Sequence, residues 1–88
     1  MEDLKKFREE IDRLDEILIS TLAMRFQITD KVGALKKAEN LPPVDRQREA
    51  KQEEQIRELA KKAGLREDIA LSVLRLIIDS VVADHKKA

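Results

Sequence analysis

A heptad pattern of apolar residues over the first 38 residues constrains the fold most strongly. No proline interrupts this stretch. Its apolar positions are Leu4, Phe7, Ile11, Leu14, Leu18, Ile28, Val32 and Leu35. Because neighbouring positions are three or four residues apart, except for the ten-residue step from Leu18 to Ile28, they lie on one face of an α-helix. The pattern predicts one helix over about residues 3–38, which would be about 54 Å long.

Two shorter helices are expected after Pro42 and Pro43, which remove backbone donors and disfavour helical geometry before them. Asp45 is expected to cap a second helix over about 46–62, which Gly64 would end. A third helix is expected over about 67–86. No segment alternates as a strand would, so we predict an all-α fold, with one long and two shorter helices in a single domain over residues 1–88.

The length of the first helix does not suit a compact monomer. A compact domain of 88 residues has a radius of gyration of about 12 Å, so one chain cannot cover both ends of such a helix. The third helix is apolar almost all round and also needs neighbours on every side. We therefore expect an intertwined helical homodimer in which the long helices pair.

The composition argues against several classes of function. The 18 Lys and Arg residues balance the 18 Asp and Glu residues, so no broad nucleic-acid or membrane surface is expected. The chain has no cysteine, and it shows no metal-ligand cluster, glycine-rich phosphate loop or nucleophile with a partnered base. The charged N-terminus is not a secretory signal, and the apolar run of the third helix is too short to span a bilayer. We expect a cytoplasmic protein without a metal or cofactor.

Two cations interrupt the apolar face. Arg25 occupies the heptad position between Leu18 and Ile28, and Lys36 lies beside Leu35. A cation on a face meant for burial costs free energy unless it is paired or binds an anion. Both project from nearly the same face, because 11 residues make about three helical turns, which span roughly 16 Å. The spacing favours a pocket for an anionic ligand. The alternatives are an ion pair with another helix for Arg25 and a solvated helix end for Lys36.

Other polar residues are ambiguous when each is considered alone. Arg8 lies about 42 Å from Lys36 along the helix. The two could therefore meet at one ligand only if the long helices of two subunits pair antiparallel; otherwise Arg8 is a flanking cation. Ser80 and Asp84 lie one turn apart on the third helix, where Ser80 could instead bond to a helix carbonyl and Asp84 stand exposed. His85 lies in a basic tail, and we expect it at the surface.

Two further features lie near these cations. Asp45, Arg48 and Glu49 open the second helix, where the simplest interpretation is a capping residue followed by solvated charges. Gly33, one turn before Lys36, is expected to permit the close approach of another helix.

Five segments, taken in order, carry a resemblance to a known family. They are FREEIDRLD at 7–15, LAMR at 22–25, VGALK at 32–36, DRQRE at 45–49 and LIIDS at 76–80. The chain from Arg8 to Glu49 fits the family pattern without a gap, whereas residues 50–75 match only in helical character. The sequence resembles the all-helical, intertwined-dimer class of chorismate mutases.

The resemblance implies a function and an anion-binding site. The implied activity is chorismate mutase, the rearrangement of chorismate to prephenate in phenylalanine and tyrosine biosynthesis, without a cofactor. Arg8 of the partner subunit and Arg25 would each bind one substrate carboxylate. Lys36 would reach the ether oxygen and a carboxylate. The reaction needs a dianion held in its reactive conformation, a task that suits arginine forks and a fixed ammonium group.

The same resemblance assigns the remaining polar positions. Asp45 and Glu49 would hold the ring hydroxyl, and Arg48 would orient the acidic side of the pocket. Ser80 would complete the wall around the ring carboxylate. Asp84 departs from the family pattern, which has glutamine or glutamate one turn after the serine, and it can donate to the ether oxygen only when protonated.

Three alternatives remain open at this stage. An isochorismate–pyruvate lyase shares the fold and uses a similar cationic pocket. A non-enzymatic helical dimerisation module would use Arg25 only to set the register of a coiled coil. The chain could also be a free-standing enzyme or one domain of a fusion with another shikimate-pathway enzyme.

Overall fold

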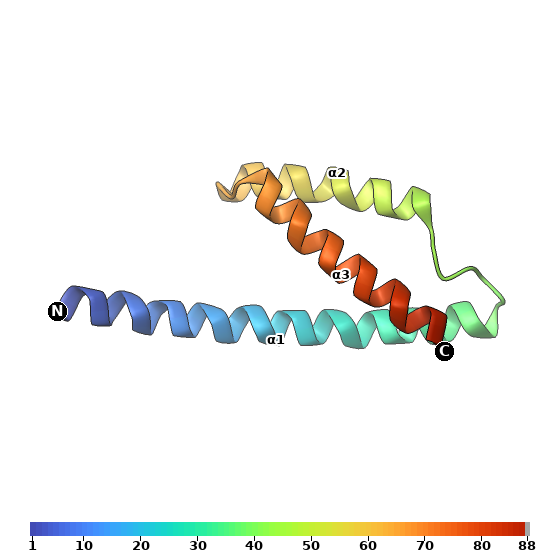
Figure 1. The fold of residues 1–88 in the computed structure, drawn as a ribbon, viewed down its shortest axis with the longest axis horizontal. Coiled ribbons are helices and arrows are strands. Elements are labelled where there is room, and N and C mark those ends of the chain that lie inside the picture. Colours follow the sequence, from blue (N-terminus) through green and yellow to red (C-terminus); the bar gives the residue numbers. More distant parts are fainter. Residues whose placement is uncertain (88) are drawn as a thin grey trace.

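The computed structural model describes residues 1–87, which form three α-helices (Figure 1). Helix α1 spans Glu2–Ala38, α2 spans Arg46–Ala63 and α3 spans Glu67–Lys87. Each end lies within one residue of the bound expected from the sequence, and the predicted all-α class with one long and two shorter helices is confirmed. None of the three helices is both long enough and apolar enough to cross a membrane.

The three helices form an open, elongated arrangement. Helix α1 runs the length of the molecule, and α3 crosses diagonally between α2 and α1 (Figure 1). Helix α3 packs against both of the other helices, whereas α1 and α2 do not approach each other within the described residues. The chain measures 57 × 24 × 16 Å and has a radius of gyration of 16.4 Å, compared with about 12 Å for a compact domain of this size.

Local hydrogen bonds end the first two helices and begin the second. Asn40 adopts a left-handed conformation with φ 55° after the end of α1, where the N–H of Leu41 donates to the carbonyl of Lys36 at 2.8 Å. Gly64, with φ 74°, ends α2 by the same pattern, as predicted. The Oδ1 atom of Asp45 accepts from the N–H three residues later at 3.1 Å, which confirms the predicted N-cap.

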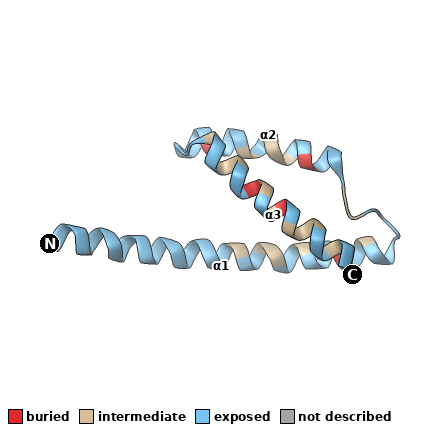
Figure 2. Cartoon of the chain, in the orientation of Figure 1, coloured by how far each residue is buried: buried red, intermediate tan, exposed pale blue. Residues whose placement is uncertain are grey.

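Burial is concentrated where α3 meets its two neighbours (Figure 2). Five of the described residues are buried: Gly33, Glu49, Ala60, Leu74 and Ile78. The first half of α1 contains none of them, and its apolar side chains are about as exposed as surface residues, with Phe7 at 61% and Leu14 at 63%. Within residues 1–87 nothing covers this apolar face.

Candidate active site

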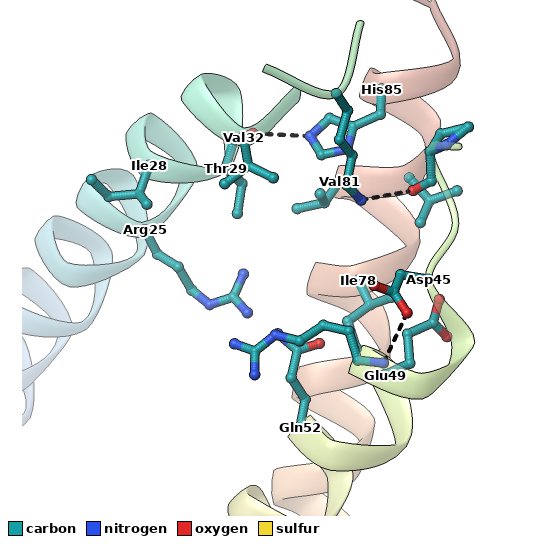
Figure 3. Close-up of a pocket in the computed structure, with 14 residues that line it drawn as sticks. Arg25, Ile28, Thr29, Val32, Asp45, Glu49, Gln52, Ile78, Val81 and His85 are labelled. Carbon is teal, nitrogen blue, oxygen red and sulfur yellow. Dashed lines mark hydrogen bonds between the residues drawn. The ribbon is translucent and has the colours of Figure 1, made fainter. Parts of the chain in front are cut away.

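A hollow of about 390 Å³ opens between the second half of α1, the start of α2 and the end of α3 (Figure 3). It is lined by Arg25, Ile28, Thr29, Val32, Lys36, Pro43, Asp45, Arg48, Glu49, Gln52, Ile78, Val81, Val82 and His85. All three helices and the proline loop contribute, so the hollow depends on the tertiary fold. Five of the eight site residues expected from the sequence line it.

Helix α1 contributes the two cations that interrupt its apolar face. Arg25 and Lys36 both line the hollow and are half-buried. The guanidinium of Arg25 extends from α1 toward α2 (Figure 3). The ammonium of Lys36 donates to the carbonyl of Pro43 at 3.4 Å, which ties the end of α1 to the loop that leads into α2. The structure therefore brings the two cations to one cavity, as their helical spacing predicted.

The first turns of α2 contribute both acidic and basic groups. Asp45, Arg48 and Glu49 line the hollow, together with Gln52 one turn later. Asp45 uses one carboxylate oxygen for the helix cap, and a carboxylate retains further accepting capacity on its other oxygen. Glu49 is 8% exposed and is the one buried charged residue in residues 1–87. It is therefore not one of the solvated charges that the simplest interpretation of this segment predicted.

Glu49 is paired across the α2–α3 contact by Arg75. The Nη1 and Nη2 atoms of Arg75 donate to its Oε1 at 3.2 and 3.1 Å. Arg75 also donates to Asp79 at 3.2 Å and to Glu53 at 3.5 Å. The hydrogen bond to Glu49 is the largest cause that raises the pKa of the Arg75 guanidinium, and Asp79 adds to it. Arg75 itself does not line the hollow.

Helix α3 presents a different face to the hollow from the one we expected. The residues that line it are Ile78, Val81, Val82 and His85, which recur at helical spacing. Ser80 and Asp84 are absent from this lining. The hydroxyl of Ser80 donates to the carbonyl of Leu76 at 2.9 Å, the helix back-bond that was the alternative for this residue, and Asp84 is exposed. Adjacent helical residues point in directions about 100° apart, and of the neighbours Asp84 and His85 it is His85 that lines the hollow.

His85 is half-buried, so our expectation of a surface histidine is wrong. Its Nε2 atom lies 2.9 Å from the carbonyl oxygen of Thr29 and, because a carbonyl only accepts, Nε2 carries the proton in this contact. Nδ1 is buried without a partner within residues 1–87. A Cβ at Gly33 would lie 2.6 Å from the Cδ2 atom of the ring. The prediction that Gly33 permits the close approach of another helix is confirmed.

Arg8 lies outside the hollow. It is exposed on the first half of α1, beside Leu4 and Asp12. Seventeen residues separate it from Arg25, which corresponds to about 25 Å along a helix. Within one chain, Arg8 and Arg25 cannot contact the same small ligand.

The lining of the hollow suits an anionic organic ligand that also carries a hydroxyl group. Three cations, Arg25, Lys36 and Arg48, face two carboxylates, Asp45 and Glu49. Arginine forks bind carboxylates in two-point contacts, while the two acidic residues can accept from a hydroxyl. Within residues 1–87, no group of three or more His, Cys, Asp or Glu side chains is arranged to hold a metal ion.

Three polar residues near the site were not singled out from the sequence as ligand-binding residues. Gln52 follows Arg48 by one turn, so helical spacing alone could have placed it beside the site. The position of His85 depends on the packing of α3 against Gly33, which a single sequence does not reveal. The pairing of Arg75 with Glu49 joins residues 26 positions apart, and no local pattern predicts it.

Residues 7–86 match the profile of the family described as chorismate mutase type II. The T-protein of Haemophilus influenzae is 40% identical over 87 residues, which cover 99% of this chain and 23% of that protein. The bifunctional chorismate mutase/prephenate dehydratase of Aquifex aeolicus is 32% identical over 90 residues, with 99% and 25% covered. The chain thus spans about a quarter of the length of these two relatives. The chorismate mutase of Methanocaldococcus jannaschii is 27% identical over 88 residues, which cover 100% of this chain and 84% of that protein.

Proposed function

This chain belongs to the chorismate mutase type II family, and we propose that it converts chorismate to prephenate in a site completed by a second copy of itself. The observation that carries the proposal is the cation-rich hollow. Arg25 and Lys36 from α1 meet Arg48 from α2 there, beside the acidic residues Asp45 and Glu49.

The reaction asks little of the protein beyond binding and electrostatics. One C–O bond of the substrate breaks while one C–C bond forms, and no proton, nucleophile or cofactor takes part. Arg25 would bind one carboxylate and help to hold the dianion in its compact reactive conformation. Lys36 would place its ammonium beside the breaking ether oxygen, where negative charge develops in the transition state. Asp45 and Glu49 would accept from the ring hydroxyl, and Arg48 would orient that acidic side.

A second subunit would supply what one chain lacks. The apolar face of α1 from Leu4 to Leu18 is uncovered, and an exposed apolar surface of this length is typical of an interface. Antiparallel pairing of two α1 helices would bury that face and bring Arg8 of the partner subunit toward Arg25. Arg8 would then bind the second carboxylate of the dianion.

The α3 side of the site needs its own test, because the resemblance and the geometry favour different residues. We expected Asp84 to face the ether oxygen and Ser80 to close the wall, whereas His85 is the polar residue of α3 that lines the hollow. We propose that His85 faces the ligand. We expect Asp84→Asn to keep kcat/KM within about twofold of wild type and His85→Ala to lower it by about tenfold or more. A larger loss of kcat/KM for Asp84→Asn than for His85→Ala would instead place Asp84 beside the ether oxygen.

The function is tested by incubating the 88-residue chain with chorismate and following substrate depletion and prephenate formation. The proposal expects prephenate, with a specific activity that rises with protein concentration as dimers form. A parallel incubation uses isochorismate as the substrate. Formation of salicylate and pyruvate from isochorismate, with no prephenate from chorismate, would instead identify a lyase. Conversion of neither substrate by dimeric protein would contradict an enzymatic role.

A further inference from the structure

Glu49 connects the hollow to a second group of charges on the outer side of α2 and α3. It lines the hollow and also a smaller outer depression that includes Arg46, Arg75 and Asp79. Its side chain is only 11% exposed. A carboxylate buried to this extent needs a paired cation or several hydrogen bonds. The group that pairs with Glu49 therefore also determines how its carboxylate faces the hollow.

The hydrogen bonds of Glu49 are all on one of its two carboxylate oxygens. Arg75 donates to Oε1 through both Nη1 and Nη2, and Arg46 donates to the same atom at 3.4 Å. Oε2 accepts no hydrogen bond within residues 1–87. Its lone pairs therefore carry no hydrogen bond there, and Oε2 is available to a donor inside the hollow.

Arg75 is itself held in place from two other directions. Asp79, one turn later on α3, accepts from its Nη1 at 3.2 Å, and Glu53 on α2 accepts from its Nη2 at 3.5 Å. A planar guanidinium with several acceptors has little freedom to rotate. Arg75 does not line the hollow, and Glu49 is the lining residue to which it donates.

We propose that Arg75 is a positioning residue: by holding Oε1 of Glu49, it directs Oε2 toward a hydroxyl group of the bound ligand. This inference rests on the proposed function, in which that hydroxyl is the ring hydroxyl of chorismate. The hydroxyl does not react, so the hydrogen bond forms equally in the bound substrate and in the transition state. Loss of such uniform binding raises KM and leaves kcat nearly unchanged.

The test compares Arg75→Gln with Arg66→Gln, a matched control that removes an exposed, ion-paired arginine from the far end of the α2–α3 hairpin. For Arg75→Gln we expect KM to rise about tenfold with kcat within about twofold, since a hydrogen bond to a charged group is lost. Arg66→Gln should leave both constants unchanged, and Arg75→Lys should recover part of the affinity. A merely structural role would reduce the folded fraction, which lowers the apparent kcat and leaves KM as it was.

Two further measurements separate the positioning role from general damage. In a Glu49→Gln background, Arg75→Gln should raise KM no further. The affinity for a substrate analogue in which hydrogen replaces the ring hydroxyl should be the same with and without Arg75. An active wild type whose KM is unchanged by Arg75→Gln, or an equal loss for the analogue, would overturn the inference alone. A wild type that does not convert chorismate would overturn the proposed function, and the inference with it.

Discussion

The two halves of α1 have similar apolar patterns but different surroundings. In the first half, the apolar heptad residues Phe7 and Leu14 are 61% and 63% exposed, and no other helix approaches them within the described chain. In the second half, Gly33 is buried against α3, and Arg25 and Lys36 face a hollow shared with α2 and α3. The second half packs against another helix of the same chain, although Ile28 and Leu35 remain 57% and 60% exposed, whereas nothing packs on the first half within the described residues.

Under the proposed function, the difference teaches that the same heptad pattern would serve two purposes in one helix. Where the pattern is purely apolar, it would provide a face for association. Where cations replace or flank the apolar positions, it would provide one wall of a ligand site. Because Arg8 lies on the first half and Arg25 on the second, a ligand that needs both would link the two halves through a second subunit.

Among changes that test this difference between the two halves of α1, the largest effect on activity is expected from Arg25→Leu. This change makes the second half as apolar as the first, so we expect the melting temperature to stay level or rise. Mutase activity should fall by roughly a thousandfold or more, because the fork that binds a carboxylate is lost. Chorismate conversion and thermal unfolding measure the two effects. Arg13→Leu, the same exchange on the exposed first half, is the control and should retain activity. A fully active Arg25→Leu protein would favour the dimerisation module.

A charge on the apolar face of the first half of α1 should lower activity by preventing dimer formation. Leu14→Glu places a carboxylate in the proposed interface, and we expect dissociation into monomers with loss of most activity at micromolar protein. Asp15→Glu introduces the same residue one position away and should change neither. Sedimentation or light scattering across a dilution series, read beside activity, provides the measurement. If the Leu14→Glu protein stays assembled and active, the first half of α1 is not the interface.

A smaller effect is expected from Gly33→Ala in the second half. The new Cβ would meet the ring of His85 at 2.6 Å, and displacing the ring would break its contact with Thr29. Overpacking costs about 1–3 kcal/mol, which outweighs the gain of about 1 kcal/mol in helix propensity. We expect a net destabilisation of about 1 kcal/mol in urea unfolding. In a His85→Ala background the same change should stabilise; a stabilisation in the wild-type background would show that α3 does not pack there.

The smallest expected effect is a change in stability from a substitution outside α1, at Arg66. The guanidinium of Arg66 lowers the pKa of Asp68 below the ordinary value of an aspartate, mainly through the hydrogen bond between them. A lowered folded-state pKa adds stability above the unfolded value, and that stability is lost as the pH falls through the folded value. Arg66→Gln should therefore be slightly less stable than wild type at pH 6, with the difference vanishing well below pH 3.8. A difference that grows on acidification would contradict this assignment.

Local rules predicted most of the fold. Periodicity predicted the three helices, Asp45 predicted the start of α2, and Gly64 predicted its end. The same periodicity predicted that Arg25 and Lys36 share a face. The helix bounds, the caps and the shared face each depend on residues within a few turns of one another, so local sequence patterns predict them.

Predictions that depended on packing between helices were less successful. Whether Asp84 or His85 faces the hollow depends on the rotation of α3 about its own axis. Adjacent residues of a helix point in directions about 100° apart. In this rotation the ring of His85 lies against Gly33, 52 positions earlier in the chain. The burial of Glu49 by Arg75 has the same origin, because solvated and buried carboxylates look identical in a helical pattern. Such contacts emerge only from the assembled fold.

The most direct test of a shared site is complementation between two inactive variants. Arg8→Ala and Arg25→Ala are prepared separately, mixed in equal amounts under conditions that allow subunit exchange, and assayed for prephenate formation. In a mixed dimer, one site carries both changes and the other carries neither, so the account predicts recovery of about a quarter of wild-type activity. A mixture that remains as inactive as its two components would contradict a site built from Arg8 of one subunit and Arg25 of the other.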